Sequence, residues 1–231
     1  MAERYAIYYA PSATSALWER ASAWLGRDAQ TGENVEGPVA GLERERLLNF
    51  TGAPSRYGFH ATLRAPFRLK PGIEEAQLVA ECAALAARLE PLPLNGIRVG
   101  IIEGFLALLC EPDPALTALA QAVVEASEPL RAPPGDKEIA RRLKAPLSER
   151  QIELLHAYGY PYVAEQFVFH MTLSERLAPE ATAEILRAAE TWFAPVLDDA
   201  AVLDRLVLYV EPDPERDFRR LDDFVLRGGG P

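Results

Sequence analysis

Apolar and polar residues alternate along two segments of the chain, 57–68 and 165–174. Successive side chains of a β-strand point to opposite faces, so this period of two predicts two strands, each with one buried face and one polar face. The polar faces are formed by His60, Thr62 and Arg64 in the first segment and by His170, Thr172 and Ser174 in the second.

Elsewhere, apolar residues recur at spacings of three and four, which predicts amphipathic helices. We expect helices that end at Gly26, span 74–88, begin after Asp113 and after Ser148, and carry Ile185, Ala189 and Trp192. Further strands are expected near 4–9, 92–100, 104–110, 200–210 and 216–226, with a long loop and a helical turn over 27–54 and a disordered tail over 228–231. The two halves of the chain share the same order of elements: a His-x-Thr strand, then a helix, then two strands. This shared order suggests an internal duplication.

The composition is that of a soluble globular protein, because 49% of the 231 residues are hydrophobic and 25% are charged. No apolar run approaches the roughly 20 residues of a membrane-spanning helix, and the first ten residues do not resemble a secretion signal. We therefore expect a cytoplasmic protein without a membrane partner. A net charge of −10 argues against a long nucleic acid as partner, since such partners are usually gripped by a basic face.

The two histidine segments share the frame Phe-His-x-Thr-Leu. A threonine hydroxyl can donate a hydrogen bond to a phosphate oxygen, and an imidazole can give or take a proton near neutral pH. Two such pairs facing each other would supply one general base and one general acid for hydrolysis of a phosphodiester. This scheme requires no metal and no cofactor, and the sequence has no cluster of carboxylates and histidines, or of cysteines, with metal-ligand spacing.

Coincidence is the competing interpretation of the motif. Only three histidines are present. The chance that a Ser or Thr stands two residues after a given residue is about one in ten. The matching Phe and Leu, and the matching faces, argue against coincidence. We therefore interpret His60 and His170 as functional, and His156 as structural or exposed.

Other residues could contact a small anionic phosphate ester, and each also has a plain structural interpretation. Arg64 and Ser174 continue the polar faces, but such residues at strand ends are often only solvated. Arg142 belongs to a basic cluster over 141–144 that either reaches the site or is an ordinary surface. Tyr162 could stack on a sugar or base, or be buried near a turn.

The paired His-x-Thr strands resemble those of the two-histidine (2H) phosphoesterase superfamily. The closer resemblance is to a bacterial family associated with phosphonate metabolism, whose genes often lie near those of carbon–phosphorus lyase. The segments that carry it are Leu25-Gly26-Arg27-Asp28, Arg56-Tyr57-Gly58-Phe59-His60-Ala61-Thr62-Leu63, Tyr158-Gly159-Tyr160-Pro161-Tyr162-Val163 and Phe169-His170-Met171-Thr172-Leu173.

The resemblance implies an α+β fold in which residues 1–231 form a single bilobal domain with pseudo-twofold symmetry. Its lobes interleave in sequence, two antiparallel sheets line a central cleft, and helices cover the outside. It also implies that His60 and His170 are catalytic and that Thr62 and Thr172 hold the phosphate.

The resemblance leaves the substrate open between a nucleoside 2′,3′-cyclic phosphate and a cyclic ribose phosphate, and the oligomeric state is open too. Two other functions compete with the cyclic phosphodiesterase: a non-catalytic protein that binds nucleotides or RNA ends in the same cleft, and an RNA-end ligase or processing factor. The acidic pI of about 4.9 counts against the RNA-end ligase or processing factor.

Overall fold

The computed structural model describes residues 3–197, 202–214 and 216–229. The elements of the first half are β1 (Arg4–Tyr9), α1 (Ala16–Leu25), α2 (Arg44–Tyr57), β2 (Ala61–Phe67), α3 (Glu75–Arg88), β3 (Leu92–Pro93), β4 (Arg98–Ile102) and β5 (Phe105–Leu109). The elements of the second half are α4 (Pro114–Ser127), α5 (Asp136–Arg142), α6 (Glu149–Tyr158), the 3-10 turn η1 (Ala164–Gln166), β6 (His170–Arg176), α7 (Pro179–Leu197), β7 (Val202–Leu203), β8 (Arg205–Glu211) and β9 (Arg219–Val225). Positions 200–201 of one predicted strand and 230–231 of the predicted tail lie outside the described residues.

Local capping explains several helix boundaries and confirms their prediction. Helix α1 ends at Gly26, whose φ of 79° is the left-handed conformation that favours glycine. Helix α4 begins at Asp113, which caps its first turn, and α6 begins with the reciprocal capping box of Ser148 and Gln151.

The prediction of a loop over residues 27–54 is wrong in its second part, because α2 begins at Arg44. Gly52 and Pro54 lie inside this helix, and their presence favoured the prediction of a loop because both residues normally weaken a helix. Tertiary packing compensates: α2 lies against α1 and β6, and its residues Leu47 and Thr51 are fully buried.

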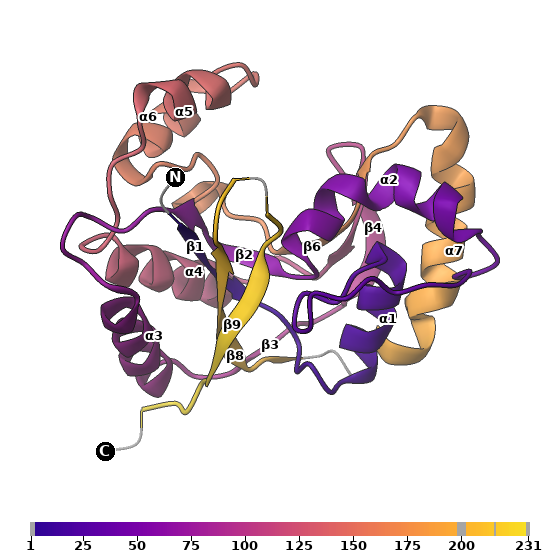
Figure 1. Ribbon diagram of the computed structural model, residues 1–231, viewed down its shortest axis with the longest axis horizontal. Helices are drawn as coiled ribbons and strands as arrows, with labels where there is room; N and C mark the ends of the chain where they lie inside the picture. Colours follow the sequence, from indigo (N-terminus) through magenta and orange to yellow (C-terminus); the bar gives the residue numbers. More distant parts are fainter. Residues whose placement is uncertain (1–2, 198–201, 215, 230–231) are drawn as a thin grey trace.

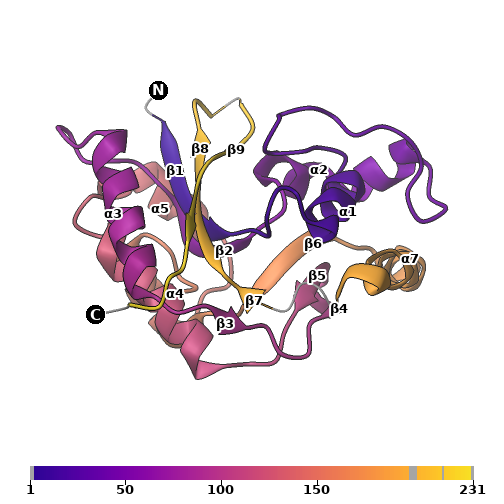
Figure 2. The same ribbon diagram turned by 90° about the horizontal axis from the view of Figure 1, so that it is seen from below.

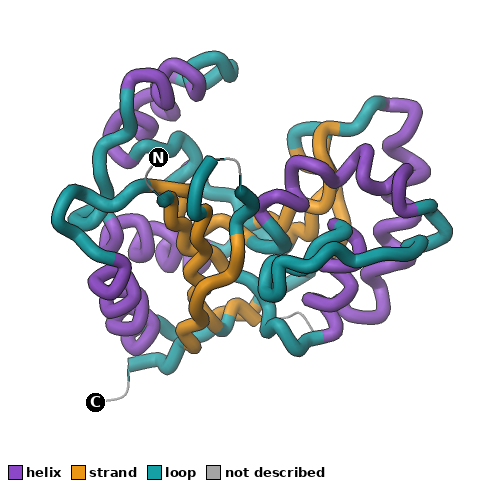
Figure 3. Tube along the Cα trace, in the orientation of Figure 1, coloured by secondary structure: helices purple, strands orange, loops and turns teal. Residues whose placement is uncertain are grey.

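The strands confirm the expected α+β class. Seven of them form one antiparallel sheet in the order β4-β5-β6-β2-β1-β8-β9, and β3 pairs with β7 in a separate ribbon (Figures 1 and 3). The two antiparallel sheets expected from the resemblance correspond to the two halves of this large sheet. They are joined at its centre, where Ala61 of β2 pairs with Met171 of β6.

Helices cover the two halves of the sheet separately (Figure 2). Helices α3 and α4 pack on the half that contains β2, β8 and β9, whereas α1, α2 and α7 pack on the half that contains β4 and β6. Each half is therefore built from chain segments that are separated by segments of the other half. The buried Trp24 of α1 fixes β6 in place by donating a 2.8 Å hydrogen bond to the carbonyl of Leu173.

Candidate active site

The two His-x-Thr motifs meet where the two halves of the sheet join. The paired residues Ala61 and Met171 are the middle residues of the two motifs. In an antiparallel ladder this register sets His60 opposite Thr172 and Thr62 opposite His170. The motifs are thus related by an approximate twofold axis through one residue pair, with all four polar side chains around it.

The two imidazole rings are held in the same way. His60 Nδ1 lies 2.9 Å from the carbonyl of Gly58, and His170 Nδ1 lies 2.8 Å from the carbonyl of Val168. A carbonyl only accepts hydrogen bonds, so each Nδ1 carries the proton and each neutral ring has a basic Nε2.

The bend before His60 requires a glycine. Gly58 ends α2 with a φ of 76°, and a Cβ atom there would lie 2.5 Å from the Cβ of Ala29. The residue whose carbonyl accepts the hydrogen bond from His60 Nδ1 is therefore also the residue that turns the chain into β2.

Both histidines have lowered pKa values. Burial lowers the pKa of His60 to about 4, with a smaller contribution in the same direction from the neighbouring His170 and an opposing one from its hydrogen bond to Gly58. Burial also lowers the pKa of His170 below its usual 6.5, although the carboxylate of Glu103 acts in the opposite direction. Both rings are consequently neutral at pH 7 in the absence of ligand, and His170 is the easier of the two to protonate.

A cavity of about 430 Å³ contains both histidines and both threonines. The charged side chains that also line it are Arg4, Arg141, Arg142, Arg176 and Glu175. Four arginines against one glutamate give this cavity a positive balance on a protein whose net charge is −10. An anion is therefore favoured here and disfavoured over much of the remaining surface.

Tyr8, which was not among the residues predicted from the sequence, stacks on His60 with the ring centroids 3.7 Å apart and the planes 19° apart. Tyr8 is 1% exposed and belongs to β1, the neighbour of β2 in the sheet. It limits the His60 ring to one plane. Residues 4–9 carry no signal for this role, because which strands become neighbours is not visible in a short sequence segment.

Arg64 does not line this cavity, contrary to the predicted polar face. Between β1 and β2 the register changes from Tyr8–Thr62 to Ile7–Arg64, so Leu63 is an extra residue in a β-bulge. The bulge reverses the alternation. Arg64 is 2% exposed, and its guanidinium donates a 2.7 Å hydrogen bond to Glu128, which follows α4.

Ser174 reaches the cavity wall, but its hydroxyl has two backbone partners. The register between β5 and β6 also shifts just beyond Thr172. The hydroxyl of Ser174 accepts a hydrogen bond from the amide of Leu106 and donates one to the carbonyl of Glu175. These bonds satisfy the strand where its ladder is interrupted, and they indicate a structural role.

Arg142 and Tyr162, whose position the sequence left open, both lie at cavities next to the histidines. Arg142 lies on the wall of the histidine cavity, with its guanidinium carbon 5.1 Å from the ring centre of Tyr160. Tyr162 lines a second cavity of about 380 Å³, which shares Thr62 and His170 with the first. Their contact with a substrate stays a prediction.

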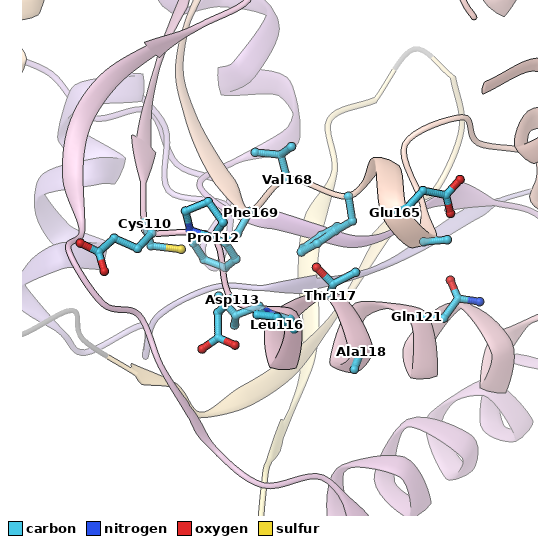
Figure 4. A pocket seen from close by; sticks show the side chains of 14 residues that line it. Cys110, Pro112, Asp113, Leu116, Thr117, Ala118, Gln121, Glu165, Val168 and Phe169 are labelled. Atoms are coloured by element: carbon cyan, nitrogen blue, oxygen red, sulfur yellow. The ribbon is translucent and has the colours of Figure 1, made fainter. Parts of the chain in front are cut away.

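A larger hollow of about 590 Å³ lies beside the start of α4, with Val168 and Phe169 on its wall (Figure 4). Its charged side chains are Glu111, Asp113 and Glu165, and no basic residue of the described chain lines it. Three carboxylates would repel a phosphate ester, so the smaller histidine cavity is the candidate active site.

Two absences hold within the described ranges 3–197, 202–214 and 216–229. No group of three or more His, Cys, Asp or Glu side chains there is placed to hold a metal ion. No helix of this part of the chain has the length and apolar character to cross a bilayer. Metal independence and a cytoplasmic location stay predictions.

Comparison with known families gives one family match and two curated relatives. A sequence model of the family described as "Protein of unknown function (DUF1045)" matches residues 62–219. A protein of Janthinobacterium sp. (strain Marseille) named ribose 1,5-bisphosphate phosphokinase PhnN is 38% identical over 98% of this chain and 51% of its own length. A protein of the same name from Laribacter hongkongensis is 36% identical over 94% of this chain and 50% of its own length. The chain thus spans about half the length of the curated relatives it matches.

Three solved structures align over nearly the whole chain at low identity. TT0787 of Thermus thermophilus is 19% identical with a TM-score of 0.42, covering 99% of each chain. A structure described as a phosphoesterase is 14% identical with a TM-score of 0.38, covering 98% of this chain and 99% of the other. Usb1 of Kluyveromyces marxianus is 11% identical with a TM-score of 0.32, covering 95% and 97%. TM-scores of this size do not establish a shared fold. The sheet and its strand order are defined by the strand pairing of this chain.

Proposed function

The chain belongs to the DUF1045 family, and we propose that it is a phosphodiesterase that hydrolyses a small cyclic phosphodiester with two histidines. The observation that carries the proposal is the pairing of the two His-x-Thr motifs through Ala61 and Met171. This pairing gathers two imidazoles and two hydroxyls around one cavity of positive balance. The motifs resemble those of 2H phosphoesterases, which agrees with this interpretation.

In the proposed reaction Thr62 and Thr172 donate hydrogen bonds to the non-bridging oxygens of the phosphate. One neutral imidazole takes a proton from water through Nε2 while the water oxygen bonds to phosphorus. The ester bond on the opposite side of phosphorus breaks. Its oxygen takes a proton from the second histidine, which is present as an imidazolium. Each histidine contributes about 10²–10⁴-fold.

The different pKa values of the two histidines suggest which one is the general base and which one is the general acid. His60, with its pKa lowered to about 4, is neutral over most of the pH range and is assigned as the base. Burial lowers the pKa of His170 as well, but its hydrogen bond to Val168 and the negative charge of Glu103 oppose this shift, and His170 is assigned as the acid. A bound phosphate favours this proton further, since an anion stabilises an imidazolium.

This assignment predicts an acidic optimum. We expect kcat/KM to rise with pH through about 4, as His60 loses its proton, and to fall through the pKa of His170, below 6.5. Replacing Glu103 with glutamine removes a charge that raises the pKa of His170, so the alkaline limb should move to lower pH. Initial rates across the pH range check this, with Glu190→Gln on the exposed side of α7 as the matched control. An alkaline limb that stays in place in Glu103→Gln contradicts the assignment.

The curated relatives favour a ribose compound among the cyclic phosphates. Their name, ribose 1,5-bisphosphate phosphokinase, describes proteins about twice as long that act on a ribose phosphate. Opening a 1,2-cyclic phosphate of ribose 5-phosphate, with the phosphate left on oxygen 1, yields ribose 1,5-bisphosphate. We therefore propose a cyclic ribose phosphate ahead of a nucleoside 2′,3′-cyclic phosphate.

A screen of cyclic phosphates tests the proposal. Purified protein is incubated with ribose and nucleoside cyclic phosphates, with and without a chelator, and the products are followed by phosphorus NMR. We expect hydrolysis of at least one compound at an unchanged rate in the chelator. Micromolar binding without turnover would instead favour a non-catalytic nucleotide or RNA-end binder in the same cleft.

A further inference from the structure

The charges are unevenly distributed along the cleft. The cavity of about 430 Å³ and the cavity of about 380 Å³ share Thr62, Phe105, Tyr160 and His170, so they are two arms of one cleft. We name the first the arginine arm, since it contains Arg4, Arg141, Arg142 and Arg176. We name the second the tyrosine arm, since Tyr162 lines it. Among the described residues, its only basic side chain is the shared His170, and it contains Glu103.

Three of the four arginines lack a close ion pair with any residue that the structure describes. Arg4 is engaged by Glu211, a fully buried carboxylate that accepts two hydrogen bonds from its guanidinium. Arg141 and Arg176 form no ion pair with any described residue, and both are exposed. Arg142 is only loosely paired, with 3.8 Å between its Nη2 and Glu138 Oε1.

The side chain of Arg142 is held on the wall of the cleft, and one of its donor groups is not used by the described residues. Its guanidinium stacks on Tyr160, a residue shared by both arms, and its Nε is buried without a hydrogen-bond partner. A buried donor without a partner costs free energy unless something accepts its hydrogen bond. An oxygen of a bound anion is an acceptor that the arginine arm would attract.

A cyclic phosphodiester alone does not account for these cations. It carries one negative charge, and two histidines and two threonines already surround the place proposed for it. A phosphomonoester carries nearly two charges and three acceptor oxygens, which match the fork of donors on arginine. Glu103 disfavours such a group in the tyrosine arm.

We propose that the arginine arm binds a second phosphate, a monoester on the same sugar as the cyclic phosphodiester, through Arg142 with Arg141. This inference rests on the proposed function and makes its substrate class narrower: a cyclic phosphate of a sugar monophosphate. The product is a sugar with two phosphomonoesters. The reaction that follows must be one that consumes a sugar bisphosphate, the class of compound in the names of the two curated relatives.

A matched pair of substrates tests the inference. Ribose 1,2-cyclic phosphate is compared with its 5-phosphate, and we expect a kcat/KM at least about tenfold higher for the 5-phosphate, as charge-assisted hydrogen bonds to phosphate provide. Arg142→Ala and Arg141→Ala should lower kcat/KM for the 5-phosphate, mainly through KM, by a much larger factor than for the unphosphorylated ester. Arg142→Lys should retain part of the preference because it keeps the charge.

Arg150→Ala is the matched control, because Arg150 is an exposed arginine on the neighbouring α6 that pairs with Glu153 and Glu165. It should keep the full preference for the 5-phosphate. Equal kcat/KM for both esters, or an equal loss on both in Arg142→Ala, would overturn the second phosphate site while the proposed hydrolysis stands.

Binding of ribose 5-phosphate separates this inference from the proposed function. Calorimetry with a variant that lacks both His60 and His170 should detect ribose 5-phosphate and not ribose, and Arg142→Ala should abolish the signal. If the wild type hydrolyses neither ester but binds ribose 5-phosphate through Arg142, the proposed function fails and the second phosphate site stands. Absence of binding to the wild type would overturn the site.

Discussion

Replacing either His60 or His170 with alanine lowers kcat on the cyclic ester by about a hundredfold or more, because each variant lacks one of the two proton-transfer groups. The loss should appear in kcat and in kcat/KM together, since the missing interaction belongs to the transition state. Initial rates at saturating substrate measure it. The double variant should lose little more than the stronger single variant, because a base without an acid completes only half of the reaction.

His156→Ala is the matched control for these variants. His156 is exposed on α6 and lines neither arm of the cleft. Its activity should equal that of the wild type, and thermal unfolding should show that all three histidine variants are folded. Full activity in His60→Ala or His170→Ala would falsify the proposed mechanism.

Replacing Glu128 with glutamine lowers the free energy of unfolding by about 2–3 kcal/mol, because it leaves the buried charge of Arg64 without a counter-charge. Glu128 accepts hydrogen bonds from both Arg64 and Arg131, at 2.7 and 2.6 Å. The expected loss is below the roughly 3–5 kcal/mol of a fully buried pair, because the Glu128 side chain is 32% exposed. Burial already lowers the pKa of Arg64 to about 10, which indicates how poorly solvated this cation is.

Urea denaturation measures this effect, and Glu125→Gln provides the control. Glu125 is an exposed residue of α4 whose carboxylate accepts a hydrogen bond from Gln121. Its replacement should change stability by no more than about 0.5 kcal/mol. Equal losses in the two variants would mean that the Arg64–Glu128 pair contributes nothing specific. Replacing Arg64 and Glu128 together with apolar residues should recover only part of the loss, since the buried Arg131 then lacks its carboxylate partner.

The sequence predicted the class of the fold and the two histidines for the same physical reason. A period of two places alternate residues on one face, and the structure brings His60, Thr62, His170 and Thr172 into one cavity. The catalytic roles of these four residues stay predictions.

The same rule failed for Arg64. Alternation holds only while the ladder is regular, and the bulge at Leu63 turns the next side chain towards Glu128. Bulges depend on how two strands twist against each other, which one strand's sequence does not specify.

Other features depend on contacts between distant segments. Helix α2 contains a glycine and a proline that suggest a loop, and only its burial against β6 and α1 makes it a helix. Tyr8 becomes a support for His60 only because β1 pairs with β2. The positive arginine arm joins residues as distant as Arg4 and Arg176. Local periodicity carries no information of this kind.

The single residue pair between Ala61 and Met171 also has a mechanical consequence. When one half of the sheet rotates against the other about this seam, each atom moves in proportion to its distance from the seam. His60, Thr62, His170 and Thr172 flank the seam, so such a rotation would displace them least. The proton-transfer groups would then keep their mutual geometry while more distant residues of the two halves moved apart.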